Sequence, residues 1–303
     1  MKRSTFIKTS LATASYMGLG GLTMSSTASD HTKKITILHT NDVHSHIDPF
    51  GPNDGRNANK GGIARRAALI SSLKAENPNT LLLDAGDIFQ GTPYFNYYGG
   101  ELEFKLMSML DYDAATIGNH DFDNGINGLL AQLPHAKFDF LSANYDFSNT
   151  ALDGLINPCK VFIKDDIKIG VFGLGIKLEG LVNKKMYKET RYLNPIEISE
   201  DMSFKLRHQE KCDLVICLSH LGYNYKNPYI MSDLQLARST KDIDLIIGGH
   251  THTFLEEPTE ETNSAGKPVL INQVGCYGLY LGKVDFYFSR NSQKSTHGTS
   301  LII

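Results

Sequence analysis

The sequence predicts an α/β fold, in which short apolar strands alternate with helical segments. From residue 33 onward, short apolar runs recur and are separated by longer, more polar stretches, the alternation that is typical of this class. One intervening stretch, residues 62–76, carries Ile63, Ala67, Ile70 and Leu73 at the spacing of a single helix face. These two observations favour strands connected by amphipathic helices.

The expected strands are the apolar runs themselves, taken in chain order. They cover residues 35–40, 80–84, 114–117, 138–143, 168–174, 214–218, 243–247, 267–272 and, as the final strand, 281–288. Residues 161–172 predict a hairpin that turns at Asp165 and Asp166, because aspartate favours turns. The helix at residues 62–76 ends at Asn77, since the residue before a proline disfavours helical backbone. We expect one domain, because neither an internal repeat nor a linker divides the sequence.

Three groups of residues have a structural interpretation that outweighs a functional one. Arg65 and Arg66 are expected on a solvated helix face rather than as phosphate clamps. The four cysteines are expected as free, buried thiols, in keeping with the burial preference of cysteine. The aromatic residues that follow Asp87 are expected in the core or in loop packing, with a substrate cleft as the alternative; they are Phe89, Tyr94, Phe95, Tyr97 and Tyr98.

The composition is that of an ordinary globular protein. Hydrophobic residues make up 41% and charged residues 21% of the 303 residues, close to the average for soluble domains. The formal net charge is -3, and no basic stripe stands out. Nucleic acid is therefore not expected as a partner.

The first 28 residues predict an export signal rather than a part of the fold. A basic start at Lys2 and Arg3 precedes an apolar stretch at residues 11–24, and residues 26–28 resemble a signal-peptidase site. The apolar stretch is shorter than the ~20 residues that span a bilayer, so no transmembrane segment is expected. The segment RSTFIK resembles the twin-arginine export motif, with Ser4 in place of the second arginine. We expect export to the periplasm, and a folded domain at residues 29–303.

Residue types that bind metals follow five of the predicted strands. They are Asp42 and His44, then Asp87, Asn119 with His120, His220, and finally His250 with His252. Ligands of α/β proteins gather where the carboxyl ends of the strands meet. Any one of these residues alone is typical of a loop, but five strand ends together predict one metal site.

The spacing and chemistry of these residues support the same prediction. Asp42 and His44 are two residues apart, as are His250 and His252, so each pair can project to one side of an extended chain. Glycines precede the ligands and permit close approach of the backbone. Carboxylate, amide and imidazole ligands without thiolate favour Mn, Fe, Zn or Co.

The motifs TNDVHSH, GDIFQGTPYF, GNHDFDNG, SHLG and GGHTH, in this order, resemble those of the calcineurin-like metallophosphoesterase superfamily. Within it, they are most similar to bacterial periplasmic 5'-nucleotidases and UDP-sugar hydrolases, over residues 33–290. The resemblance implies a four-layer α/β/β/α sandwich and two divalent metal ions. The implied ligands of the first ion are Asp42, His44, Asp87 and His252. Those of the second are Asp87, Asn119, His220 and His250, with Asp87 bridging, and His120 with Asp123 is the implied catalytic dyad.

The sequence departs from the family pattern in a few places. Asp121 stands where the family often has glutamate, a change that we expect to be tolerated because this residue is not an implied ligand. Some members have glutamine in place of His252. Nucleotidases of this family also carry a C-terminal domain with base-stacking aromatics, which we expect to be absent from this chain. We expect a separate chain to supply that domain, with the aromatic loop at residues 89–98 facing it.

The resemblance implies an exported phosphoesterase with two metal ions that hydrolyses small phosphate esters, foremost 5'-nucleotides. The same metal centre also suits cyclic phosphodiesters, nucleotide sugars or a sulfur oxyanion conjugate. A different class of function is a metal-bound partner subunit without turnover. The intact pair of His120 and Asp123 argues against that last alternative.

Overall fold

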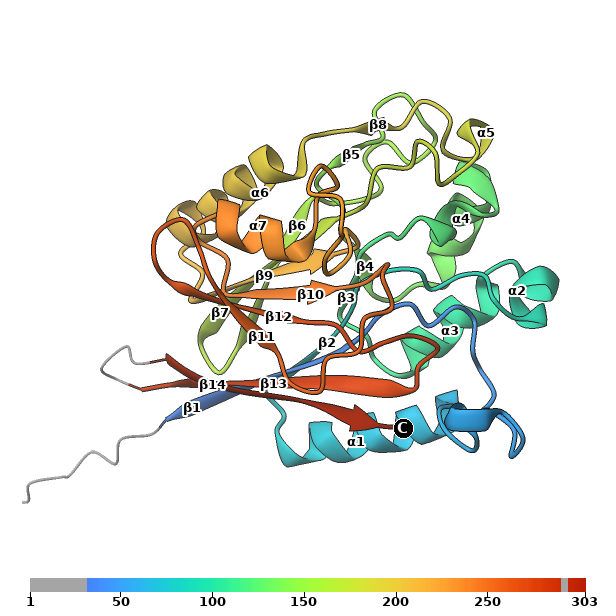
Figure 1. Cartoon of the computed structure of the whole chain (residues 1–303), viewed down its shortest axis with the longest axis horizontal. Coiled ribbons are helices and arrows are strands. Elements are labelled where there is room, and N and C mark those ends of the chain that lie inside the picture. The colour runs from blue at the N-terminus through green and yellow to red at the C-terminus, as the bar shows by residue number, and fades with distance from the viewer. Residues whose placement is uncertain (1–31, 290–293) are drawn as a thin grey trace, which may run out of the picture. The chain divides into compact units, whose positions relative to one another are not determined.

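Two six-stranded β-sheets form the centre of the part that the computed structural model describes, residues 32–289 and 294–303 (Figure 1). The predicted export signal at residues 1–28 lies outside the described residues. The first sheet has the strand order β14 (Lys294–Ile302), β13 (Tyr280–Phe288), β1 (Lys33–Thr40), β2 (Thr80–Asp84), β3 (Ala114–Ala115) and β4 (Asp139–Phe140). The second has the order β11 (Thr259–Thr262), β12 (Pro268–Asn272), β10 (Leu245–Gly248), β9 (Leu214–Ser219), β7 (Ile167–Leu174) and β6 (Cys159–Lys164).

Each sheet combines four parallel strands with two antiparallel ones. In the first sheet, β1, β2, β3 and β4 are parallel to one another, whereas β13 and β14 are antiparallel to their neighbours. In the second sheet, β7, β9, β10 and β12 are parallel. The carboxyl ends of the parallel strands therefore lie along one edge of each sheet, where ligand-binding loops gather.

Alternating side chains divide the apolar residues among three cores. Leu81 and Leu83 of β2 face the second sheet, and Leu82 faces the helices on the other side, because successive strand residues point to opposite faces. The core between the sheets also receives Ile169 and Val171 of β7. A third core lies on the outer face of the second sheet. Three cores separate four layers, so the predicted α/β/β/α sandwich is confirmed.

Helices cover the outer face of each sheet. Helices α1 (Ile63–Glu76), α2 (Pro93–Tyr98), α3 (Glu101–Met109) and α4 (Gly125–Gln132) contribute to the core on the first sheet. Helices α6 (Pro195–Phe204) and α7 (Asp233–Ser239) contribute to the core on the second. Figure 1 shows α1 on one side of the two sheets and α6 with α7 on the other. A short helix, α5 (Lys184–Tyr187), and the two-stranded sheet of β5 (Tyr145–Asp146) and β8 (Arg191–Tyr192) complete the layers.

The strand predictions hold for the apolar runs but miss the polar strands. Each predicted run contains a strand, and the hairpin is confirmed: β6 pairs with β7, and Asp165 and Asp166 have φ of 49° and 60°, which suits a tight hairpin turn. The prediction that residues 281–288 form the final strand is wrong, because β14 follows and pairs with β13 along its length. Polar edge strands such as β11, with the sequence TEET, carry too little apolar pattern to be predicted.

The prediction that both arginines of α1 face solvent is wrong for Arg66. Arg65 is exposed, but Arg66 is only 3% exposed. Arg66 lies three residues after Ile63 and four before Ile70, on the stripe of the helix that faces the sheet. The face of α1 that packs on the sheet therefore includes Arg66, whereas the sequence pattern predicts Ala67 on that face.

Sequence analysis predicts four free, buried cysteines and no transmembrane segment. Cys212 and Cys217 are buried, Cys159 and Cys276 are half-buried, and all four are free in the described part of the chain. Within residues 32–289 and 294–303, every helix is too short or too polar to cross a membrane.

Candidate metal centre

The predicted ligands lie at the carboxyl ends of five parallel strands. Asp42 and His44 follow β1, Asp87 follows β2 and Asn119 follows β3, all in the first sheet. His220 follows β9, and His250 and His252 follow β10, in the second sheet. Nε2 of His220 lies 3.1 Å from Oδ2 of Asp87, so the strand ends of the two sheets meet at one place.

The backbone at the site is held in an unusual conformation. The residues with left-handed φ include Asp42 (49°), His44 (50°), Asp87 (55°), His250 (72°) and His252 (52°). This region costs a residue other than glycine about 1–2 kcal/mol, and such outliers gather at functional sites. Backbone hydrogen bonds offset the cost: the amide of Asp42 donates to Gly86, and the amide of His44 donates to Asp87.

A first cluster contains Asp42, His44 and His252, whose ligand atoms all lie within 4.8 Å of one another. The Nε2 atoms of His44 and His252 are 3.0 Å apart, and Nε2 of His252 is 3.4 Å from Oδ1 of Asp42. Nδ1 of His44 lies 3.1 Å from the carbonyl oxygen of Phe89, which favours a proton on Nδ1 and a lone pair on Nε2. Converging lone pairs and a carboxylate fit a cation between them.

A second cluster contains Asp87, His220 and His250, again with ligand atoms within 4.8 Å. Oδ1 of Asn119 lies 2.7 Å from Nδ1 of His250, so the amide joins this cluster. Nδ1 of His220 lies 2.7 Å from the carbonyl oxygen of Ala85, and its fully buried Nε2 faces Oδ2 of Asp87 at 3.1 Å. A buried ring nitrogen that faces a carboxylate, with the other ring nitrogen held by a carbonyl oxygen, fits a metal ligand.

Asp87 lies between the two clusters. Its Oδ2 is 3.1 Å from Nε2 of His220 and 3.8 Å from Nε2 of His44. Its Oδ1 accepts a hydrogen bond of 2.8 Å from the amide of His120. The carboxylate therefore faces both clusters in a fixed orientation.

The pKa values at the site reflect this crowding of charge. Burial by itself raises the pKa of Asp87, but the charge and hydrogen bond of His220 outweigh it and hold that pKa below its usual range. Burial lowers the pKa of His220, yet Asp87 raises it to about 10. Burial and the charge of His220 lower the pKa of His250 to about 4. A bound cation would replace the proton on His220, because metal ligands must be deprotonated.

Glycines allow the loops to approach each other closely. An added Cβ at Gly118 would lie 2.2 Å from Oδ1 of Asp87, and one at Gly86 would lie 2.6 Å from the amide nitrogen of Gly118. Gly86 also has a φ of 87°. A side chain at Gly118 would displace the Asp87 carboxylate, and one at Gly86 would push away the backbone of Gly118.

The predicted dyad lies beside the clusters, outside both of them. His120 begins the short helix η2 (His120–Phe122), and its Nδ1 is 2.9 Å from Oδ2 of Asp123. The rings of His120 and His44 have centroids 5.3 Å apart. The side chains of His120 and Asp123 are 38% and 30% exposed, so a substrate can reach them. The hydrogen bond that His120 donates to Asp123 raises the pKa of His120 despite partial burial.

Asp121 is a residue whose importance the sequence analysis missed. It is fully buried and accepts hydrogen bonds from the backbone amides of Gly118, Asp87, Ile88 and Phe89, at 2.7 to 3.2 Å. It thereby ties the loop after β3 to the loop after β2. The expectation that aspartate is tolerated here in place of the family's glutamate stays a prediction. An acidic residue next to His120 resembles a solvent-exposed loop residue, so the sequence alone gave no signal.

The aromatic residues after Asp87 divide between core and surface. Phe89 and Phe95 are buried in the core, as expected. Tyr97 and Tyr98 are 83% and 44% exposed, and the hydroxyl of Tyr94 donates to Asp48 at 2.7 Å.

Comparisons with known proteins agree with this geometry. The model of the calcineurin-like phosphoesterase family matches residues 35–254. A snake venom 5'-nucleotidase of Naja atra is 34% identical over 84% of this chain and 50% of its own length. The crystal structure of a 5'-nucleotidase precursor from Thermus thermophilus superposes with a TM-score of 0.81 and 33% identity, over 89% of this chain and 55% of that one. The NAD nucleotidase of Haemophilus influenzae gives a TM-score of 0.77 and 28% identity, over 90% and 57%.

The chain spans about half the length of the venom enzyme and of both solved structures. The family model, however, matches well over half of this chain. The chain therefore belongs to the calcineurin-like phosphoesterase family.

Proposed function

We propose that this chain is a phosphoesterase with two divalent metal ions that hydrolyses 5'-nucleotides. The observation that carries the proposal is the pair of ligand clusters around Asp87, with His120 and Asp123 next to them. The two divalent ions of the family have matching places in this chain.

Each cluster would hold one ion. Asp42, His44 and His252 would bind the first, and Asn119, His220 and His250 the second, with Asp87 shared. When bound, the ions would lower the pKa of a water molecule and neutralise charge on the phosphate. Backbone carbonyl oxygens already fix the rings of His44 and His220, so the protein would lose little free energy in ordering these ligands.

His120 would donate a proton to the oxygen of the leaving group. Nδ1 of His120 is held by Asp123, so the proton on Nε2 is free to face the substrate. The hydrogen bond to Asp123 raises the pKa of His120, which favours the protonated ring that a general acid requires. Asp123 acts through His120 as a positioning residue.

The names of the relatives support nucleotides as substrates. The relatives from Naja atra and Thermus thermophilus are named 5'-nucleotidases. One relative's name includes the word venom and another's the word precursor. Both words support export of this chain by a signal at residues 1–28. Export by the twin-arginine route is a finer part of the same proposal. The comparisons give no support to a separate chain that supplies a second domain.

Hydrolysis of defined substrates by the purified, Mn-loaded chain tests the proposal. AMP, cyclic AMP, UDP-glucose and a sulfur oxyanion conjugate are compared, with the Asp87→Ala variant as the control for the metal centre. We expect release of phosphate from AMP that EDTA and Asp87→Ala both abolish. Preference for another of these substrates would change the assigned substrate, and no turnover of any would favour the non-catalytic subunit.

A further inference from the structure

The segment after β12, residues 273–277, contains none of the predicted metal ligands. It nevertheless binds both of the loops that bring ligands from β1 and β10. The amide of Gly275 donates to the carbonyl oxygen of Thr253 at 2.9 Å, and the amide of Tyr277 donates to that of Asp42 at 2.7 Å. Strand β12 lies beside β10 in the second sheet, whereas β1 lies in the first. The segment therefore joins the ligand loops of the two sheets.

Gln273, the first residue after β12, binds the loop after β10 through its side chain. It is fully buried. Its Nε2 donates to the carbonyl oxygen of Gly249 at 2.5 Å. Its Oε1 accepts from the hydroxyl of Thr251 at 2.9 Å and from the amide of Thr253. These partners determine which end of the amide is the nitrogen, and they use both lone pairs of its oxygen. One side chain thus holds three alternate residues of a single loop.

That loop delivers one imidazole ring to each metal cluster. His250 belongs to the second cluster and His252 to the first. In an extended chain, residues two apart point to the same side, but here both histidines have left-handed φ, of 72° and 52°. Such strained backbone persists only where its surroundings hold it. The three partners of Gln273 precede, separate and follow the two histidines, so its hydrogen bonds hold the loop in this conformation.

Asn41 binds the same segment from the first sheet. Its Oδ1 accepts from the amide of Val274 at 3.0 Å, and its Nδ2 donates to the carbonyl oxygen of Gly275 at 2.7 Å. The same Nδ2 donates to Oδ2 of Asp42 at 2.6 Å. The amide of His250 also donates to the Asp42 carboxylate, at 2.9 and 3.0 Å. The carboxylate of the first cluster and the loop with both histidines are therefore held by one segment.

We propose that Gln273 is a positioning residue that directs His250 to one metal ion and His252 to the other. The inference rests on the proposed function, to which the two ions belong, and it adds a residue that binds neither ion. Hydrogen bonds that orient metal ligands change metal affinity by about 10- to 100-fold. Because the partners of Gln273 flank both histidines, loss of its hydrogen bonds weakens the binding of both ions together.

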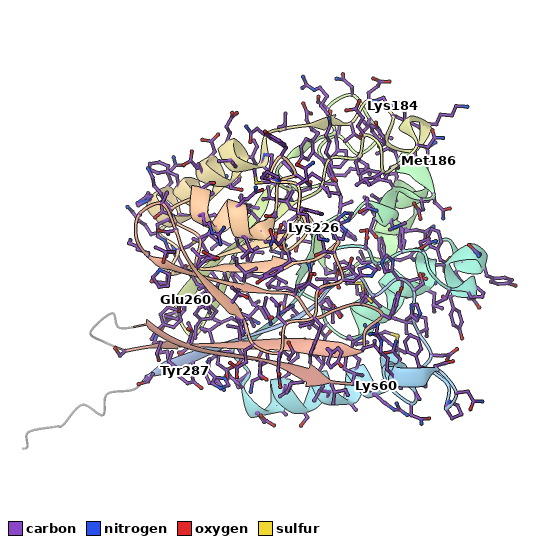
Figure 2. The ribbon with its side chains drawn as sticks, viewed as in Figure 1. Lys60, Lys184, Met186, Lys226, Glu260 and Tyr287 are labelled. Atoms are coloured by element: carbon purple, nitrogen blue, oxygen red, sulfur yellow. The ribbon has the colours of Figure 1, made fainter. Side chains whose placement is uncertain are left out.

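A pair of matched variants tests this role. Gln273→Met keeps the length of the side chain and removes its hydrogen bonds. Asn263→Leu is the control, because Asn263 is 5% exposed and its amide also makes three bonds to backbone groups in the described part of the chain. Asn263 lies between β12 and β11, the strand that carries Glu260 in Figure 2. The two amides therefore flank β12, but only Gln273 lies at the end where the ligand loops meet.

Metal affinity and hydrogen exchange are measured on both variants. Titration with Mn, followed by electron paramagnetic resonance, should show both ions weakened by about 10- to 100-fold in Gln273→Met and unchanged in Asn263→Leu. In EDTA, without any metal, the amides of residues 249–253 should exchange about tenfold faster in Gln273→Met, because a protecting hydrogen bond is lost. Asn263→Leu loses as many bonds, so it shows what reduced stability alone does to both readouts.

Thr251→Val gives a second test of the same contact if Gln273→Met fails to fold. It removes the hydroxyl that donates to Gln273 and that accepts from the amide of Tyr223. It should weaken both ions by about fivefold, whereas Thr251→Ser, which keeps the hydroxyl, should bind them as the wild-type chain does.

The outcomes separate this inference from the proposed function. If the folded variants bind both ions within about threefold of wild type, well short of the expected loss, or lose only one ion, Gln273 does not position both histidines. An equal loss in Asn263→Leu would overturn the inference as well. In each of these cases, hydrolysis of AMP by the wild-type chain still supports the proposed function. If the variants weaken both ions as expected but the wild-type chain hydrolyses no substrate, the inference stands and the proposed function is wrong.

Discussion

Replacing Gly118 with alanine should perturb the carboxylate of Asp87, the proposed shared ligand, without removing any proposed ligand. The new Cβ would lie 2.2 Å from Oδ1 and 2.4 Å from the backbone nitrogen of Asp87, whereas an ordinary contact begins at 3.4 Å. The loop after β2 therefore has to move by about 1 Å, and a displacement of that size costs on the order of 100-fold in rate. Forcing a methyl group into a packed site also costs about 1–3 kcal/mol of stability.

Two measurements follow for Gly118→Ala. We expect kcat/KM for AMP to fall about 100-fold, and the bound metal to decrease, because Asp87 no longer faces both clusters. Gly51→Ala is the matched control, since its nearest neighbour is the flexible side chain of Asp54 at 3.3 Å, and it should keep full activity. A Gly118→Ala variant with two bound ions and activity within threefold of wild type would refute the argument from close approach.

Three further predictions concern other buried or polar groups. Burial lowers the pKa of the fully buried His39 to about 3, so only the unfolded chain binds a proton at this residue as the pH falls below about 6.5, and folding stability decreases. The loss is about 2 kcal/mol between pH 6.5 and 5. The His39→Gln variant should avoid this loss, as measured by urea unfolding in EDTA. Asp121→Ala leaves four backbone amides without their acceptor. It should lower kcat/KM for AMP at least tenfold, roughly the effect of losing a contact that supports a metal ligand. Asp121→Glu should retain most activity. Asp123→Asn should lower kcat about 10- to 100-fold with little change in KM, because the ring of His120 loses its orienting partner; an equal rise in KM would assign Asp123 to substrate binding instead.

The arrangement of the metal centre could be predicted because strand ends are visible in the sequence. The apolar runs before Asp42, Asp87 and His220 locate the carboxyl ends of β1, β2 and β9, and parallel strands bring such ends together. The four-layer order of the sheets came from the family resemblance, since apolar periodicity does not say which sheet a strand joins. Whether each clustered residue binds a metal ion is still a prediction.

Residues whose role depends on tertiary contacts could not be predicted. Asp121 and Arg66 are charged and therefore resemble surface residues, yet the fold buries both. Strand β14 has few apolar residues and is fixed by its pairing with β13, a contact that local sequence does not encode.

Metal content, measured together with activity, tests the central claim that one carboxylate joins two metal sites. Inductively coupled plasma mass spectrometry is applied to the wild-type chain, Asp87→Ala and His120→Ala after loading with Mn and removal of free metal. Wild type should hold two ions per chain, and Asp87→Ala should lose both ions and all activity, since its carboxylate faces both clusters. His120→Ala should keep two ions and lose most activity, because His120 lies outside both clusters. Equal metal loss in the two variants, or a single ion in the wild-type chain, would contradict the account.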